Sequence, residues 1–105
     1  MELMTAELAQ TIPPLYSTED NADPTVVVKY FVPWNQWTWY VLEGEQDEDG
    51  DWLFFGRVKG HETELGYFQL SELESIRGPA GLGIERDLYF DPKPYSEIDA
   101  YSLAD

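Results

Sequence analysis

Four runs of β-branched and aromatic residues follow one another through the middle of the chain, with only short segments between them. TVVVKYFV begins at Thr25, WTWYVLEGE at Trp37, DWLFFGRV at Asp51 and ETELGYFQL at Glu62. Residues of these types favour a pleated, half-buried backbone, and sequential strands joined by short turns usually pair with their neighbours. The pattern therefore predicts a four-stranded antiparallel meander sheet.

The segments between these runs contain the residues that tight turns require. Residues 33–36, PWNQ, separate the first two runs, and Lys59-Gly60 ends the third. Asp49-Gly50 is the strongest signal, because a short hairpin turn needs positive φ angles that few residues tolerate. Side chains of the second run should alternate between two faces, with Trp37, Trp39 and Val41 on one and Thr38, Tyr40 and Leu42 on the other.

Two short helices are expected beside this sheet. Residues 2–12 place apolar side chains at near-helical spacing, and Pro13-Pro14 cannot continue a helix. Ser71, followed three residues later by Glu74, matches a capping box at the start of a second helix around residues 71–76. Gly78-Pro79 would end that helix.

The expected fold class is α+β, with a four-stranded antiparallel meander sheet packed by a short N-terminal helix and a second short helix. IERDLYF, which begins at Ile84, is a candidate fifth strand at the edge of the sheet. A length of 105 residues fits a single domain, residues 1–105, and exceeds the size at which a fold usually needs disulfides or metals.

The chain contains no cysteine, which excludes disulfides, thiolate catalysis and zinc sites with sulfur ligands. Its N-terminal segment has no basic region and no long apolar core, so we expect no signal peptide. Nowhere do about 18 consecutive apolar residues occur, and we expect no membrane span. These features favour a cytoplasmic location.

Acidic residues greatly outnumber basic ones, with 21 Asp and Glu against six Lys and Arg and a net charge of −15. Phosphate contacts require a basic face, so direct binding of nucleic acid or of an anionic membrane is disfavoured. A partner recognised through charge would be a protein with a basic surface, including one whose usual ligand is DNA. The simpler interpretation is that the acids only keep the domain soluble.

No group of residues in the sequence assembles catalytic or metal-binding chemistry. Asp47, Asp49 and Asp51 alternate as in a calcium loop, but the EF-hand positions for Gly and Glu hold Trp52 and Val58. The single histidine has no marked partners for a catalytic triad. We therefore expect no enzyme, no cofactor and no metal site.

Two groups of residues are candidates for contacting a partner. Trp34 and Trp37 lie at the first turn, and exposed tryptophans are enriched in binding hot spots, although core packing is the favoured role for most rings here. Alternate residues of a strand lie about 6.7 Å apart, so a row of acids could present charge at nearly the density of a nucleic-acid backbone. Four acids have this spacing at the predicted hairpin: Glu43, Glu45, Asp47 and Asp49.

Several segments of the chain together resemble a known family. In order, these are IPPLYSTED, ADPTVVVKYFVP, WTWYVLEGE, FFGRVKG, ELGYFQLSELESIRGPAGLGIERDLYF and YSEI. From about Leu8 to Ile98 the chain is similar to the bacterial domain-of-unknown-function 2958 family. The resemblance implies a cytoplasmic bacterial protein encoded on plasmids or other mobile elements, often near DNA-processing or antirestriction genes. It implies no assigned activity and no catalytic residues.

The leading hypothesis is a non-enzymatic protein-binding module. One alternative is an acidic DNA mimic that occupies the basic groove of a restriction, modification or CRISPR-type protein, and another is a small enzyme of unrecognised type. A continuous acidic stripe on the surface would favour mimicry, whereas scattered acids would favour solubility. A deep cleft with convergent polar groups would favour an enzyme.

Overall fold

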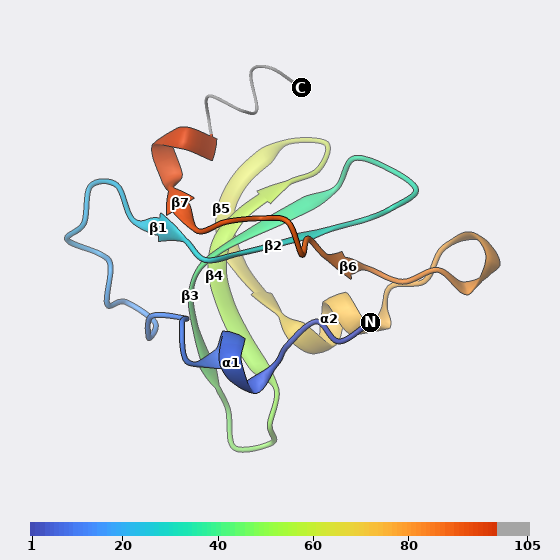
Figure 1. The fold of residues 1–105 in the computed structure, drawn as a ribbon, viewed down its shortest axis with the longest axis horizontal. Coiled ribbons are helices and arrows are strands. Elements are labelled where there is room, and N and C mark those ends of the chain that lie inside the picture. The colour runs from blue at the N-terminus through green and yellow to red at the C-terminus, as the bar shows by residue number, and fades with distance from the viewer. Residues whose placement is uncertain (99–105) are drawn as a thin grey trace.

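The computed structural model of the protein describes residues 1–98, which form two antiparallel sheets and several short helices (Figure 1). The larger sheet has five strands in the order β5-β4-β3-β2-β6. A smaller sheet pairs β1 (Thr25–Val26) with β7 (Lys93–Pro94). The strands of the larger sheet are β2 (Val28–Phe31), β3 (Thr38–Gln46), β4 (Trp52–Lys59), β5 (Thr63–Gln69) and β6 (Glu85–Arg86).

Strands β2 to β5 confirm the predicted meander, because each pairs antiparallel with the next strand along the chain. β6 supplies the fifth strand and pairs with β2 at the opposite edge from β5. The first predicted strand is divided at Val27, whose N–H donates to the Val41 carbonyl at 3.0 Å. β1 then leaves the larger sheet to pair with the C-terminal segment.

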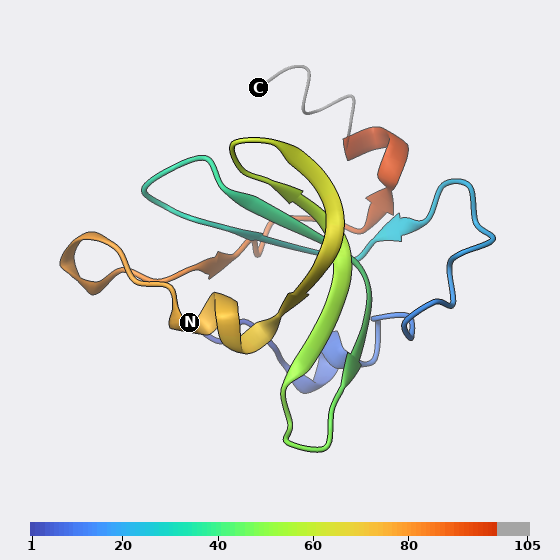
Figure 2. The ribbon, with the colours of Figure 1, turned by 180° about the vertical axis from the view of Figure 1, so that it is seen from behind.

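The helices are short, and α2 lies at the end of β5 (Figure 2). α1 (Ala6–Ala9) is a single turn whose N-cap is Thr5, and it covers only part of the predicted 2–12 helix. α2 (Leu70–Ser75) continues directly from β5, and the 3₁₀ turn η1 (Pro79–Gly81) precedes β6. Residues 95–98 are also helical.

Both faces of the larger sheet carry a hydrophobic core, as the alternation in the second predicted strand requires. Fully burying one large apolar side chain contributes about 1.5–3 kcal/mol, so the two cores supply most of the stabilising free energy. The first core includes Tyr30, Trp39, Val41 and Phe54, covered by Leu3, Ile12, Leu70 and Leu73. The second consists of Val26, Tyr40, Leu42 and Ile98, with Phe55, Phe90 and Tyr95 packed against it.

The phenol of Tyr30 reaches deep into the first core. It is 0% exposed, and its hydroxyl donates to the Leu3 carbonyl at 2.6 Å. Burial raises the pKa of Tyr30 far above its ordinary value, so this phenol remains a neutral donor. The bond attaches the N-terminal segment to the sheet.

The predicted capping box at Ser71 is wrong. The helix begins at Leu70, and the N-cap residue Gln69 makes no side-chain cap bond. Instead, the Asp51 carboxylate accepts bonds from the Ser71 hydroxyl at 2.7 Å and from its N–H at 3.0 Å. The Ser71 hydroxyl is the main cause that holds the pKa of Asp51 below its ordinary value. A carboxylate from the β3–β4 hairpin therefore caps α2 in place of a local residue.

We expect Asp51→Ala and Ser71→Ala each to lower the free energy of unfolding by about 0.5–2 kcal/mol, the range for a lost helix cap. Because both substitutions remove the same contact, the double variant should lose clearly less than the sum. Urea unfolding at pH 7 measures all three values. Additive losses would show that the two side chains do not stabilise α2 as a pair.

Gly50 confirms the predicted hairpin turn, since its φ angle is 88°. Of residues 47–51, only Gly50 has a positive φ, so the connection is a longer turn with one left-handed residue. Asp47 stabilises it, because its Oδ1 accepts bonds from the N–H groups of Asp49 at 2.9 Å and Asp51 at 3.0 Å. One acid of the predicted phosphate-like row thus has a structural role.

The Gly50→Val variant should lose about 1–3 kcal/mol of unfolding free energy, because a β-branched residue resists positive φ. Gly66→Val is the matched control, since a Cβ at Gly66 would meet nothing within 4 Å. The urea midpoint should fall for the first variant and stay close to wild type for the second. Equal midpoints for Gly50→Val and wild type would contradict the turn geometry.

Candidate functional site

A β-bulge in β3 determines which side chains face the second core. The register between β3 and β4 shifts between Val41 and Glu43, so that Glu43 lies opposite Phe55. A bulge inserts one extra residue and thereby re-aims the side chains that follow it. Leu42 and Glu43 consequently line the same cavity as Phe55.

The Glu43 carboxylate is buried beneath this cavity, with only 4% of the residue exposed. Its Oε1 accepts a bond from the Tyr16 N–H at 2.7 Å, and its Oε2 accepts bonds from the Thr18 N–H at 3.0 Å and from the Thr18 hydroxyl. Burial alone would raise the pKa of Glu43, but these bonds outweigh it and hold the pKa below its ordinary value. The prediction that Glu43 belongs to an exposed row of acids is therefore wrong.

The loop that bonds to Glu43 has an unusual backbone. Tyr16 adopts a positive φ of 69°, which is uncommon for a bulky residue and costs about 1–3 kcal/mol. The Gly44 N–H donates to the Pro13 carbonyl at 2.9 Å, which fixes the start of the same loop. Such strain persists only where surrounding contacts enforce it, and Glu43 supplies the central ones.

The fixed loop and the sheet enclose a cavity of about 500 Å³, which we call the groove. Its exposed rim includes Tyr16 at 59%, Leu65 at 55% and Tyr67 at 52% exposure. The rings of Phe55 and Tyr67 lie side by side, with centroids 5.0 Å apart. The groove is lined by Tyr16, Thr18, Glu19, Asn21, Ala22 and Pro24 from the loop, Leu42 and Glu43 from β3, Phe55 from β4, Leu65 and Tyr67 from β5, and Tyr95.

β5 adds an open strand edge to the groove. Among residues 1–98, β5 pairs only with β4, so the backbone groups of its outer side face away from the sheet. An edge strand of seven residues is long enough to accept an additional strand. Leu65 and Tyr67 are two residues apart, so their side chains lie on the same face of β5, and both line the groove.

The predicted tryptophans lie on the other face of the sheet. Trp34 and Trp37 are partly buried against the first core, and neither lines the groove. A Cβ at Gly78 would lie 2.3 Å from the Trp34 ring, and one at Gly60 would lie 2.5 Å from the Trp37 ring. Glycine at both positions lets these rings lie flat on the backbone, which indicates a packing role.

The remaining predicted acids are exposed but separate from the groove. Glu45, Asp47 and Asp49 lie at the β3–β4 hairpin, and none of them lines the cavity. The structure thus separates the predicted partner-binding residues, with two against the first core, three at a hairpin tip and Glu43 in the groove. The exposed rim of the groove was not identified from the sequence. The signal for it was the pair of apolar residues Leu65 and Tyr67, which lie on one face of the last strand of the meander.

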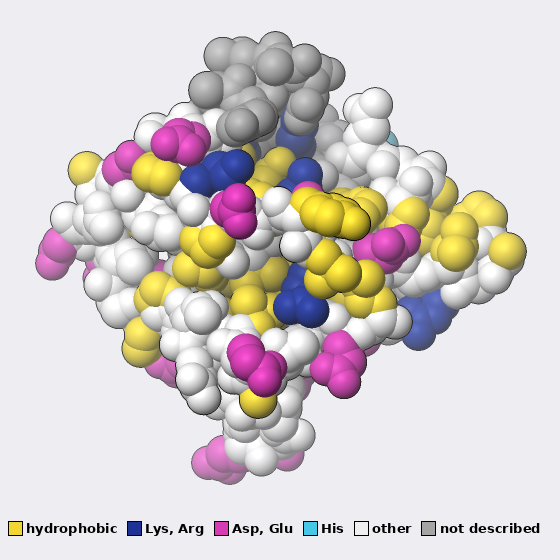
Figure 3. Space-filling model, in the orientation of Figure 1, with side chains coloured by type: hydrophobic (Ala, Val, Ile, Leu, Met, Phe, Trp, Pro, Cys, Tyr) yellow, Lys and Arg dark blue, Asp and Glu magenta, His cyan; other side chains and the backbone are white. Residues whose placement is uncertain are grey.

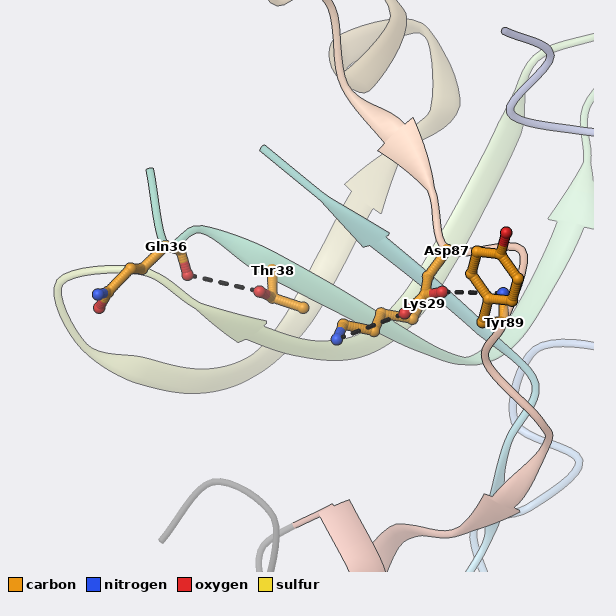
Figure 4. A network of polar contacts seen from close by, with 5 residues as sticks. All are labelled: Lys29, Gln36, Thr38, Asp87 and Tyr89. Carbon is orange, nitrogen blue, oxygen red and sulfur yellow. Dashed lines mark hydrogen bonds and ion pairs between the residues drawn. The ribbon is translucent and has the colours of Figure 1, made fainter. Parts of the chain in front are cut away.

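Acidic side chains are scattered over the face shown in Figure 3, among hydrophobic and basic ones. The Asp87 carboxylate lies 3.6 Å from the Lys29 ammonium group, and its other oxygen accepts a bond from the Tyr89 N–H at 2.9 Å (Figure 4). These contacts attach the segment after β6 to β2. On this face, no single acidic stripe is present.

A second cavity of about 410 Å³ lies between α2 and the segment that leads to β6. Arg77 lines this cavity, and its guanidinium group donates to the carbonyls of Glu74 at 2.6 Å and Ile76 at 2.8 Å. This cation therefore completes the C-terminal end of α2. Among residues 1–98, no three metal-ligating side chains cluster, and no helix is long and apolar enough to cross a membrane.

The fold and the groove define an α+β protein with a cavity beside an open strand edge. A family model described as a protein of unknown function (DUF2958) matches residues 3–102, nearly the whole chain. The chain belongs to this family, which confirms the resemblance seen in the sequence. No curated protein and no solved structure matches the chain.

We expect Glu43→Gln to lower the unfolding free energy at pH 7 by about 1.5–3 kcal/mol, the range for hydrogen bonds to a charged group. Because the pKa of Glu43 is depressed in the folded state, its contribution is present above the unfolded-state pKa and is lost as pH falls through the folded pKa. The difference between wild type and variant should therefore shrink in strong acid. Urea unfolding from pH 7 to pH 2 measures it, and a constant or absent difference would contradict the role of Glu43.

Proposed function

We propose that the chain is a non-enzymatic protein-binding module whose contact surface is the groove and the outer edge of β5. The observation that carries the proposal is an open seven-residue strand edge with two half-exposed hydrophobic side chains, Leu65 and Tyr67, beside a cavity. Strand addition at an edge supplies affinity through backbone bonds, and neighbouring pockets for side chains supply specificity.

The chemistry of the groove favours binding over catalysis. Its buried carboxylate, Glu43, accepts bonds from Tyr16 and Thr18, so both oxygens are occupied by the protein itself. With its pKa below the ordinary value, this carboxylate carries no proton to donate near neutral pH. The structural role of this buried carboxylate supports a binding surface.

Apolar contacts alone would give such a surface modest affinity. Each of Leu65 and Tyr67 is already about half buried, so covering the remainder contributes about 1 kcal/mol per side chain. Backbone pairing along β5 and at least one further specific contact must therefore supply the remaining free energy. The partner is best described as an extended protein segment.

Acidic DNA mimicry is the second candidate, and the observations that favour it are the net charge of −15 and the exposure of Glu45, Asp47 and Asp49 at the hairpin. Burial of Glu43 and the role of Asp47 in the turn weaken this hypothesis. Both candidates are consistent with a cytoplasmic bacterial protein encoded on a mobile element. They differ in which surface contacts the partner.

Affinity capture from an extract of the native host distinguishes the two surfaces. Wild type and the control Leu88→Ser/Tyr89→Ser, which removes two other exposed side chains, should retain the same protein. The groove variant Leu65→Ser/Tyr67→Ser should lose it, because both of its substitutions lie at the groove. Retention by the groove variant, or equal loss by both variants, would contradict the proposal.

The mimicry hypothesis predicts the opposite dependence. A hairpin variant, Glu45→Gln/Asp49→Asn, should then lose the partner, and DNA should compete with the wild-type protein for it at low salt. The binding-module proposal expects this hairpin variant to capture the partner as wild type does. Mass spectrometry identifies the proteins that the wild type and each variant retain.

A further inference from the structure

We propose that the groove binds the cationic side chain of an arginine or lysine in an extended partner segment that pairs with β5. This inference rests on the proposed function and assigns the chemistry of the partner. Three independent features of the groove support it: its aromatic walls, the sign of its charged residues, and the spacing of its side chains along the open strand.

Aromatic rings supply much of the wall of the groove. Tyr16, Phe55, Tyr67 and Tyr95 all line it, and the Phe55 and Tyr67 rings are tilted by 54° at a centroid distance of 5.0 Å. Cations are attracted to the faces of aromatic rings within about 6 Å, and several rings around one cavity form the recognised cage for such groups. A neutral apolar ligand would fit these rings as well, so charge decides between the two.

Both charged side chains that line the groove are acidic. Glu19 lies on the loop wall and Glu43 at the base, whereas no Lys or Arg is among the lining residues. The pKa of Tyr67 is raised, chiefly by its hydrogen bond with Tyr16 and by burial, and the negative charges of Glu43 and Glu19 add to this rise. The site therefore favours positive charge, and an anionic ligand would be repelled.

Rings on this face of the sheet already hold cations of the chain itself. The Arg57 guanidinium lies over Tyr95, with 5.6 Å between its carbon and the ring centroid, and the Lys29 ammonium lies 5.9 Å from the centroid of Tyr40. Arg57 is buried and does not line the groove. Tyr16, Phe55 and Tyr67 belong to the same aromatic surface and line the cavity.

Pairing with the edge of β5 determines the position of the cationic residue in the partner segment. Side chains of an added strand alternate between the two faces of the sheet, so only every second one points toward the groove. One such side chain would lie beside Tyr67, and the next, about 6.7 Å along, would lie beside Leu65. The expected partner segment therefore carries an arginine or lysine two residues from an apolar residue.

A symmetric capped peptide, Gly-Val-Thr-Arg-Thr-Val-Gly, tests this chemistry, because it presents the same spacing in either strand direction. The control peptide has citrulline, a neutral group of the same shape, in place of arginine. In NMR titrations of the full chain, the arginine peptide should bind about tenfold more tightly and should shift the amide signals of Tyr16, Phe55 and Tyr67. Added salt should reduce this preference. Equal affinity of both peptides would overturn the proposal.

Two variants with the same change of charge locate the cation. Glu19→Gln removes an acid at the groove, and Glu48→Gln removes an exposed acid at the hairpin tip. Glu19→Gln should weaken the arginine peptide about threefold or more and leave the citrulline peptide unchanged, while Glu48→Gln should affect neither. Equal weakening by both variants would show that net charge alone attracts the peptide, and would overturn the assignment.

The outcome separates this inference from the proposed function. If host-protein capture depends on Leu65 and Tyr67 but arginine gives no advantage over citrulline, the cation assignment fails and the binding module stands. If neither capture nor peptide binding depends on the groove, both proposals fail. An arginine preference that Tyr67→Leu abolishes, together with groove-dependent capture, supports both.

Discussion

The hydrogen bonds that Glu43 accepts from Tyr16 and Thr18 hold the groove in place. A bulge in β3 turns this carboxylate toward the second face, where burial would be costly unless its oxygens were bonded. The backbone of the loop provides those bonds and, in doing so, takes up the strained conformation of Tyr16. The Glu43 carboxylate therefore connects the sheet to the loop, and the cavity lies between them.

The same interaction recurs at two other places in the fold. Asp51 accepts bonds from the N–H and hydroxyl of Ser71, and Asp23 accepts the same pair from Ser96. In each case a carboxylate joins segments that lie far apart in the sequence. With six Lys and Arg for 21 acids, hydrogen-bond donors of Ser, Thr and the backbone serve where another protein would use an ion pair. Part of the acidity of the chain is thus structural.

The sequence allowed the sheet to be predicted, because strand periodicity and turn chemistry are local. The alternation around Tyr40, the glycine turn at Gly50 and the edge strand at Glu85 all follow from neighbouring residues. The capping of α2 was predicted wrongly because the capping residue, Asp51, lies in the β3–β4 hairpin, 20 residues before Ser71 in the sequence. The place of Glu43 in the groove could not be predicted, since a single bulge decides which face it occupies and no local pattern marks that bulge.

Amide hydrogen exchange in the loop tests most directly whether Glu43 organises the groove. The N–H groups of Tyr16 and Thr18, which bond to the carboxylate, should exchange far more slowly than that of the exposed Asp20 in the same loop. Their protection should disappear in Glu43→Gln, while protection in the centre of β4 remains. Fast exchange at Tyr16 and Thr18 in the wild-type protein, or protection that survives the substitution, would contradict this account.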